Sequence, residues 1–188
     1  KALDPAPRVA AAEAREEVRG RALADGVADE AHDGPGEWLA ACEVVVLCTP
    51  VAVIEALLEP VSRRMGEGAV LTDVGGAKER VVEVARRDVP RRTAFVGAHP
   101  MFGGRGGYEA ARADRWRGGT VAVCTDGADA GALERVEALH AGLGAEVAFC
   151  RAGEPDPAGA LVPHLPYRLA GAPPLPARAA GPLAARPA

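Results

Sequence analysis

Uninterrupted apolar runs alternate along this chain with segments in which apolar residues recur every three to four positions. A short continuous apolar run is typical of a strand buried on both faces of a sheet, and the longer period is typical of an amphipathic helix. The apolar runs predict strands at 43–49, 68–74, 93–98, 119–125 and 145–150. The periodic segments predict helices at 51–65, 77–87 and 129–143, and the Ala-rich stretch 5–26 predicts another.

The alternation predicts the α/β class, with a Rossmann-like, largely parallel sheet and helices on both of its faces. Residues 1–4 could be the last residues of a further strand. In such sheets ligands bind beyond the carboxyl ends of the strands. Polar residues and glycines gather at these ends, so we expect the functional site there.

Composition narrows the class of protein. The chain has 188 residues and a net charge of −4, and its arginines are interspersed with acids, which argues against a nucleic-acid-binding face. No apolar run is long enough to span a membrane. The four cysteines show no spacing that suits a metal, so we expect no metal, reduced thiols and a cytoplasmic protein.

Both ends of the sequence differ from the middle. The chain opens on KALDP and closes on a stretch rich in Pro, Ala and Arg, which cannot hold a regular helix or strand. A phosphate-binding GxGxxG loop with the right context is missing. We expect a piece of a longer protein, with a partial dinucleotide-binding domain at 1–150 and a linker plus the start of a helical domain at 151–188.

Two strand ends carry candidate cofactor contacts. Asp4 could hydrogen-bond the adenine ribose and favour NAD over NADP. Asp-Pro is also a helix N-cap followed by proline, which the motif taken alone favours. Thr49 and Pro50 follow the strand at 43–49, where a hydroxyl and a carbonyl could face a cofactor. Pro50 could also simply start the next helix.

The stretch DVGGAK places an acid, two glycines and a lysine after the strand at 68–74. Gly75 and Gly76 would let the backbone approach a ligand, next to the free N–H groups of a helix N-terminus. Asp73 precedes them, and Lys78 could pair with a carboxylate. An ordinary turn with Lys78 in solvent explains the same pattern.

His99, in GAHPMFGG, is the strongest single candidate. Histidine can exchange a proton near neutral pH, and Pro100 favours an extended backbone that would aim the ring from a loop after the strand. His164, in PHLPY, is a second His-Pro element that could contact substrate or lie in a linker. His32 and His140 are expected to face solvent.

Together these segments resemble the prephenate/arogenate dehydrogenase family. The resemblance runs from about residue 4 to residue 169 and rests on VVLCTPVAVI, LTDVGGAKERVVE, VGAHPMFGGRGGYEAARADRWRGGTVAV and LVPHLPYRLA. It implies a nicotinamide-binding domain, a C-terminal helical domain that forms a homodimer, and NAD-dependent oxidative decarboxylation of prephenate or arogenate in tyrosine biosynthesis.

The resemblance also implies roles for single residues. His99 would be the catalytic base. The cofactor would contact Asp4, Thr49, Pro50, Asp73 and Gly75, and the substrate would contact Gly76, Lys78 and His164. At position 76 the family usually has serine, which helps to hold the substrate hydroxyl and the histidine, and this chain has glycine.

Two other functions remain open. Another NAD(P)-dependent hydroxyacid dehydrogenase would share the sheet and use a lysine, for which Lys78 is the candidate. A degenerate dinucleotide-fold module would bind a metabolite or a partner without catalysis. Gly76 and Pro163, where the family usually has serine, and the Pro-rich C-terminal stretch favour it modestly.

Overall fold

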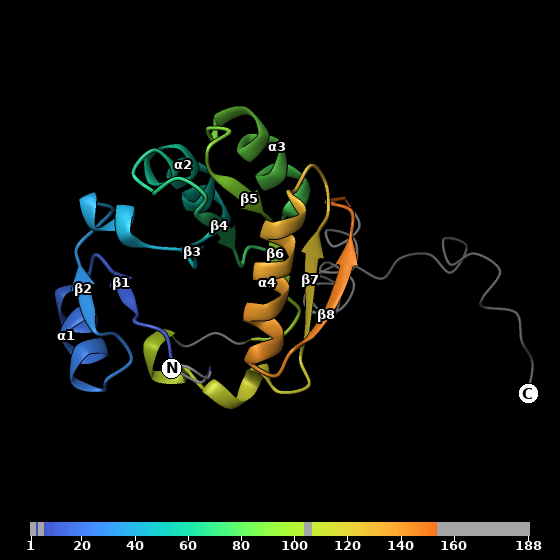
Figure 1. Ribbon diagram of the computed structural model, residues 1–188. Coiled ribbons are helices and arrows are strands. Elements are labelled where there is room, and N and C mark those ends of the chain that lie inside the picture. The colour runs from blue at the N-terminus through green and yellow to red at the C-terminus, as the bar shows by residue number, and fades with distance from the viewer. Residues whose placement is uncertain (1–2, 4–5, 104–106, 154–188) are drawn as a thin grey trace, which may run out of the picture. The chain divides into compact units, whose positions relative to one another are not determined.

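Strands and helices alternate along the chain in the computed structural model, which describes residues 3, 6–103 and 107–153 (Figure 1). The strands are β1 (Ala10–Ala12), β2 (Glu30–His32), β3 (Val44–Leu47), β4 (Val70–Asp73), β5 (Ala94–Val96), β6 (Ala98–Pro100), β7 (Thr120–Cys124) and β8 (Glu146–Cys150). The α-helices are α1 (Glu16–Ala24), α2 (Val51–Ser62), α3 (Lys78–Asp88) and α4 (Ala130–Gly142). Short 3-10 turns are η1 (Glu37–Ala41), η2 (Gly107–Ala110) and η3 (Ala113–Trp116).

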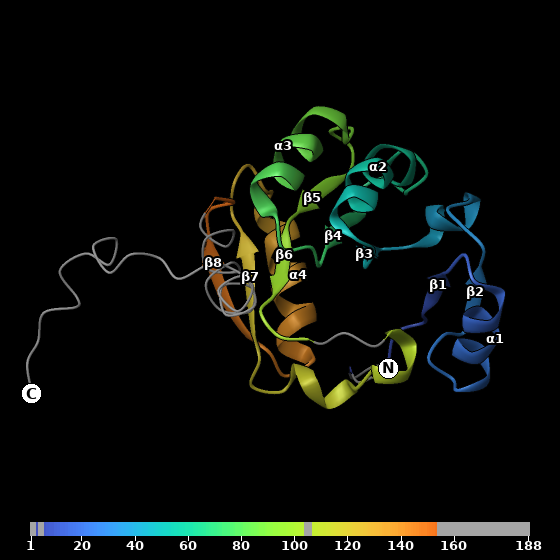
Figure 2. The same cartoon turned by 180° about the vertical axis from the view of Figure 1, so that it is seen from behind.

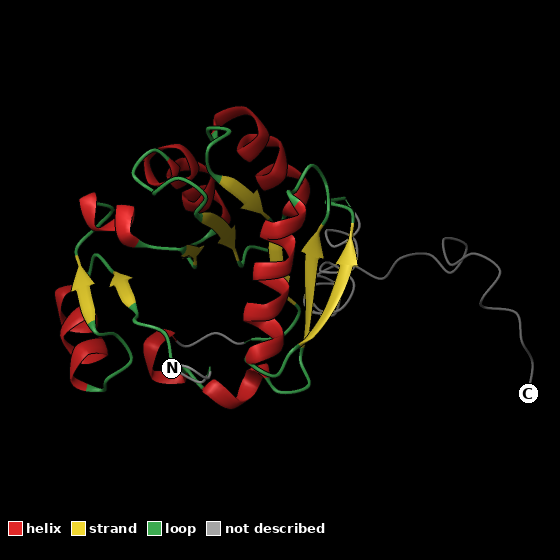
Figure 3. Cartoon of the chain, in the orientation of Figure 1, coloured by secondary structure: helices red, strands yellow, loops and turns green. Residues whose placement is uncertain are grey.

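Hydrogen bonds join the strands into three groups (Figure 3). The strands β3, β4 and β5 pair in parallel, and so do β1 with β2 and β7 with β8. Only the β6–β7 pair, among the described strands, is antiparallel. The predicted largely parallel α/β fold is therefore confirmed. Within these groups β1 and β3 are edge strands.

Helices cover both faces of the sheet around β4. Successive strand residues point to opposite faces, and Val70 and Leu71 show this directly. Leu71 packs in a buried cluster with residues of α2 and α3, while Val70 packs in a second cluster with Ala132 and Val136 of α4. Figures 1 and 2 show α4 on one side of β4–β6 and α2 with α3 on the other.

Most predicted elements are present with small shifts at their ends. The continuous apolar runs became β3, β4, β7 and β8, and the periodic segments became α2, α3 and α4. The N-terminus of α4 is capped by Asp129, whose carboxylate accepts the Ala132 N–H at 3.1 Å. In the described chain no helix is long and apolar enough to cross a membrane.

The helix expected across 5–26 is wrong in its first half. Residues Ala10–Ala12 form β1, and the helix α1 begins only at Glu16. Alanine has the highest intrinsic helix propensity, but β1 pairs in parallel register with β2, and the Glu13 N–H continues the ladder to the His32 carbonyl at 3.0 Å. Long-range pairing therefore overrides local propensity here.

His32 does not face solvent as expected. It ends β2, and its ring stacks on Trp38 of η1 with 4.4 Å between ring centroids and 5° between planes. Its side chain is 30% exposed. The aromatic contact explains why a histidine in a polar stretch is partly covered.

Candidate active site

The carboxyl ends of β3 and β4 lie side by side. The two strands are parallel, and Leu47 pairs with Asp73 at their last residues. Thr49 and Pro50 follow β3 and are exposed, and Pro50 immediately precedes α2. This edge is where an α/β sheet of this kind presents its ligand-binding groups.

Asp73 and Lys78 form a buried ion pair at this edge. Both side chains are fully buried, and the Lys78 ammonium contacts Asp73 Oδ2. The same carboxylate accepts the Gly75 N–H at 2.9 Å and the Ala98 N–H at 3.3 Å. Burial raises the pKa of Asp73, while the Lys78 ammonium and these two N–H groups oppose the rise. The pair thus ties together the end of β4, the start of α3 and the start of β6.

His99 lies inside a strand instead of in the expected loop. It is the central residue of β6 and stands opposite Ala122 of β7. The strand forms by pairing with β7: the Cys124 N–H donates to the Gly97 carbonyl at 2.8 Å, and residues 98–100 continue the ladder. His99 is therefore held by a ladder as well as by Pro100, and its side chain is half-buried.

The loop after β4 passes close to the imidazole. A Cβ placed on Gly76 would lie 3.4 Å from His99 Nε2 and 3.5 Å from Cε1. Gly75 is packed more tightly, since a Cβ there would lie 3.0 Å from Asp73 Oδ2 and from Ile54 Cδ1. The structure thus brings Asp73, Gly75, Gly76, Lys78 and His99 into one site.

A cavity of about 480 Å³ opens beside this site. Its lining includes Cys48 after β3, Val74 after β4 and Pro100 next to His99. Phe102 and Trp116 form an aromatic part of the wall. Pockets of this size accommodate small organic molecules.

Two arginines at this cavity were not singled out from the sequence. Arg112 and Arg115 line it, and both are exposed. Arg112 pairs with Asp114 at 3.1 Å, whereas Arg115 has no hydrogen bond or ion pair with any residue in the described ranges. No pattern in the sequence points to them, because only the chain path through η2 and η3 brings this segment to the cavity.

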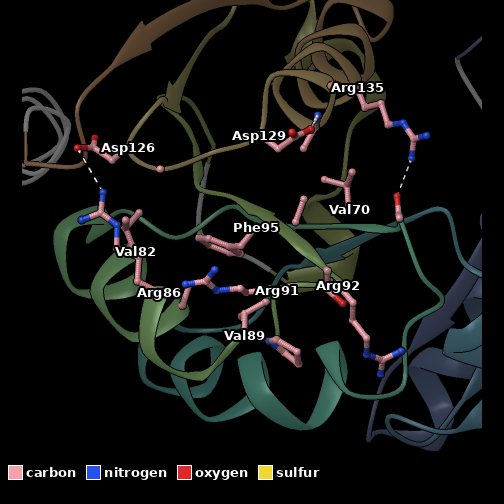
Figure 4. Close-up of a pocket in the computed structure, with 18 residues that line it drawn as sticks. Val70, Val82, Arg86, Val89, Arg91, Arg92, Phe95, Asp126, Asp129 and Arg135 are labelled. Carbon is pink, nitrogen blue, oxygen red and sulfur yellow. Dashed lines mark hydrogen bonds and ion pairs between the residues drawn. The ribbon is translucent and has the colours of Figure 1, made fainter.

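A second cavity, of about 600 Å³, lies away from these residues (Figure 4). It is lined by the first residues of β4 and β5, the end of α3 and the loop before α4. Arg86 pairs with Asp126 at 3.7 Å, and Arg135 donates to the Gly68 carbonyl at 3.0 Å. None of the predicted site residues lines it, so its larger volume does not make it the candidate active site.

A carboxylate that sequence reasoning missed follows β1. Glu13 accepts hydrogen bonds from the Arg15 N–H at 3.0 Å and from Arg15 Nε at 2.9 Å. These hydrogen bonds lower the pKa of Glu13 to about 2, so the group is ionised near neutral pH. The signal was present as a short apolar run, Val9–Ala12, followed by an acid, but alanine hid it. Asp4 and His164 lie outside the described residues.

Comparison with known proteins agrees with this arrangement. The family model described as the nucleotide-binding domain of prephenate dehydrogenase matches residues 3–149. Prephenate dehydrogenase from Bacillus subtilis is 29% identical over 169 residues, 88% of this chain and 46% of that protein. The 4-amino-4-deoxyprephenate dehydrogenase of Streptomyces pristinaespiralis is 38% identical over 137 residues, 70% of this chain and 43% of that one. The chain thus spans about half the length of these relatives.

Solved structures share the fold. Prephenate dehydrogenase from Aquifex aeolicus superposes with a TM-score of 0.80 at 24% identity, covering 88% of this chain and 60% of that one. The same score and identity hold for the A. aeolicus enzyme in complex with hydroxyphenyl propionate and NAD+, with 88% and 58% covered. Because the family model extends across most of the described residues, the chain belongs to the prephenate dehydrogenase family and carries its nucleotide-binding domain.

Proposed function

We propose that this chain provides the cofactor-binding and catalytic part of an NAD-dependent dehydrogenase that oxidatively decarboxylates prephenate or arogenate in tyrosine biosynthesis. The proposal rests mainly on the position of His99. This residue is held in β6, close to Gly76 and beside the 480 Å³ cavity. Relatives named prephenate and cyclohexadienyl dehydrogenase support it.

The residues present fit a nicotinamide dinucleotide. Glu13 offers an ionised carboxylate after β1, where such folds hold the adenine ribose. Thr49 and Pro50 are exposed after β3. The tight packing of Gly75 against Asp73 and Ile54 holds the loop after β4 at the same edge of the sheet. NAD+ supplies the hydride acceptor when it is bound. We assign the ribose to Glu13 in place of Asp4.

His99 acts as the general base. Oxidation of the ring alcohol to a carbonyl requires the hydroxyl to lose its proton, and a neutral imidazole nitrogen can accept it. Departure of carbon dioxide then makes the six-membered ring aromatic, which makes the overall reaction favourable. The strand around His99 fixes the ring before substrate arrives, so little reorganisation is needed at the moment of proton transfer.

Charge at the cavity suits a carboxylate-bearing substrate. Arg115 lines it without a partner among the described residues, and a guanidinium binds a carboxylate through two parallel hydrogen bonds. Lys78 acts indirectly, because its ammonium is buried against Asp73. That burial also disfavours the rival in which Lys78 is the catalytic lysine of another hydroxyacid dehydrogenase.

The test is a substrate comparison on the longest reading frame that contains these 188 residues. NADH formation is followed with prephenate, arogenate and simple β-hydroxyacids, each with NAD+. Turnover of either cyclohexadienyl compound, with the hydroxyacids inert, supports the proposal. Turnover of the hydroxyacids alone would overturn it, and so would NAD+ binding with no turnover of any of these compounds.

Cofactor preference should depend on Glu13. Replacing it with serine removes the carboxylate that repels a 2′-phosphate and releases Arg15, whose guanidinium can bind that phosphate. We expect Glu13→Ser to shift the ratio of kcat/KM for NAD+ over NADP+ by about tenfold or more towards NADP+. Steady-state kinetics with both cofactors measure the ratio.

Glu16 provides the matched control for this prediction. It lies at the first position of α1, and serine there leaves the Glu13–Arg15 pair in place. Glu16→Ser should keep the original ratio. An unchanged ratio in Glu13→Ser would show that the ribose is held elsewhere.

Serine at position 76 should improve catalysis. A Cβ on Gly76 would lie 3.4 Å from His99 Nε2, so a serine hydroxyl carried on it can hydrogen-bond the imidazole. Gly76→Ser should raise kcat by about two- to tenfold, the equivalent of one hydrogen bond. Gly76→Ala adds the Cβ without the hydroxyl and should not do so. Equal rates for both variants would mean that the hydroxyl finds no partner there.

The family also suggests the oligomeric state, the location and the partners of the whole protein. We propose a homodimer formed through a helical domain, with the linker and the first residues of that domain at 151–188. We also propose a cytoplasmic location and a small-molecule substrate, with no nucleic-acid or membrane partner. Gel filtration with light scattering on the longest reading frame tests the homodimer.

A further inference from the structure

Three aromatic rings from distant parts of the chain stack beside the active-site cavity. Phe102 follows β6, Trp116 ends η3 and His140 belongs to α4. Phe102 meets Trp116 edge to face, with 5.1 Å between centroids and 81° between planes. Trp116 stacks on His140 with 5.3 Å between centroids at 15°. Each ring therefore supports the next.

His140, the ring of the stack that lies on α4, is buried without hydrogen bonds from the described residues to its ring nitrogens. The sequence predicted that it faces solvent, but it is 1% exposed, because Trp116 covers it and α4 turns this side towards the sheet. Neither of its ring nitrogens has a hydrogen-bond partner in the described chain. An imidazole buried in this way stays neutral, since a charge without water or a partner is costly.

The other end of the stack forms the cavity wall. Phe102 and Trp116 both line the cavity beside His99, and Pro100 joins them there. A displacement of Trp116 would therefore change the shape of the space that receives the substrate. Among the described residues of α4, His140 alone makes an aromatic ring contact with Trp116.

We propose that His140 is a positioning residue, which in its neutral form holds Trp116 and Phe102 as the wall of the substrate cavity and releases them when it is protonated. Only the expected change in KM rests on the proposed function. The ring contacts themselves require no substrate.

The direction of the pH effect follows from burial. Burial alone lowers the pKa of His140 from its usual 6.5. The stack is therefore complete above pH 6.5 and is lost as the pH falls through the lowered value. The titratable or charged side chains on the elements around His140 are Glu134, Arg135 and Glu137 on α4, Asp114, Arg115 and Arg117 at η3, Asp73 on β4, His99 on β6, Cys124 on β7, and Glu146 and Cys150 on β8. None of them contributes to this shift.

Tryptophan fluorescence tests the inference without any assay of activity. The chain has two tryptophans, so Trp38→Phe leaves Trp116 as the single reporter. Release of Trp116 from the stack exposes its indole to water, which shifts the emission to longer wavelength. The emission maximum of Trp38→Phe should move to longer wavelength as the pH is lowered, with a midpoint below 6.5. Adding His140→Phe, which keeps a ring in the stack but cannot be protonated, should abolish the step.

The outcome that overturns the inference is a pH step that survives in the double variant, or one with its midpoint at or above 6.5. A Trp38→Phe protein with no step before it unfolds would overturn it equally. Both variants lack the Trp38 indole, so the contact between His32 and position 38 cannot produce the signal.

Kinetics on the longest reading frame separate positioning from stability. His140→Ala should raise KM for the cyclohexadienyl substrate about fivefold or more with a smaller change in kcat, and His140→Phe should restore it. Val136→Ala is the control, because it removes buried volume one turn away on the same helix and leaves all three stacked rings in place. It should lower stability and leave KM unchanged.

If KM rises equally in Val136→Ala and His140→Ala, His140 contributes only packing to the core, and the positioning role is overturned. If the unmodified protein forms no NADH, the proposed function fails, and the fluorescence measurement still decides whether His140 holds Trp116.

Discussion

Replacing His99 with asparagine should lower kcat with the cyclohexadienyl substrate by about 10²–10⁴-fold, the usual contribution of a positioned general base. Asparagine is close in size and can still hydrogen-bond the substrate hydroxyl, but it cannot accept a proton. KM should change little, because the β6–β7 ladder that fixes the backbone at this position does not depend on the side chain. Steady-state NADH formation on the longest reading frame measures both constants.

His32 provides the control for this replacement. It too is a partly covered histidine in a strand, but it lies in β2, and its ring packs on Trp38. Its link to Glu13 is through the backbone carbonyl, which the replacement keeps. His32→Asn should leave kcat within about twofold of the original. A His99→Asn protein with nearly full kcat would remove the basis of the proposed mechanism, and a protein that binds NAD+ equally well with either residue and turns over no substrate would favour the non-catalytic module.

Replacing Lys78 with methionine should lower the free energy of unfolding by about 3–5 kcal/mol, since it leaves a buried carboxylate without its cation. Both members of the Lys78–Asp73 pair are fully buried, so solvent screening does not weaken the effect. Methionine keeps most of the length and apolar volume of the lysine stem, so the loss reports on the charge. Urea unfolding followed by circular dichroism measures the change.

Arg80 is the matched control two residues further along α3. It pairs with Glu55 at 3.3 Å, and its side chain is 61% exposed. Arg80→Met should change the free energy of unfolding by less than about 1 kcal/mol, as is usual for surface ion pairs.

A double replacement tests the pairing. Asp73→Asn with Lys78→Met removes both charges and keeps a side-chain oxygen for the Gly75 and Ala98 N–H groups. It should be more stable than Lys78→Met alone, because no unpaired buried charge remains. A Lys78→Met protein as stable as Arg80→Met would mean that Asp73 does not depend on the lysine.

The sequence predicted the elements best where burial is complete. The strands β4 and β7 are built from apolar runs that are buried along nearly their whole length, and such runs leave a pattern that can be read without knowing the partners. The strand β1 was not predicted, because the alanines of Ala10–Ala12 favour a helix. The segment becomes a strand by pairing with β2. That pairing joins residues about twenty positions apart, and a local pattern carries no trace of it.

The candidate site was predicted in part for the same reason. The motif around His99 identified the residue, but whether it lies in a loop or a strand depends on its pairing with β7. Lys78 was expected to contact substrate or solvent, and its burial follows from the packing of α3 against the sheet. Glu13 and His140 were missed because only the paired β1 and the covered face of α4 give them their surroundings.

The edge of β3 affects how this chain behaves in solution. β3 pairs with β4 on one side, it is an edge strand of its group, and its residues read Val-Val-Val-Leu, with Val46 36% exposed. An exposed apolar edge strand offers unpaired N–H and C=O groups to any other strand, including β3 of a second copy. Aggregation of the purified chain should therefore rise with its concentration, and a lysine in place of Val46 should reduce it.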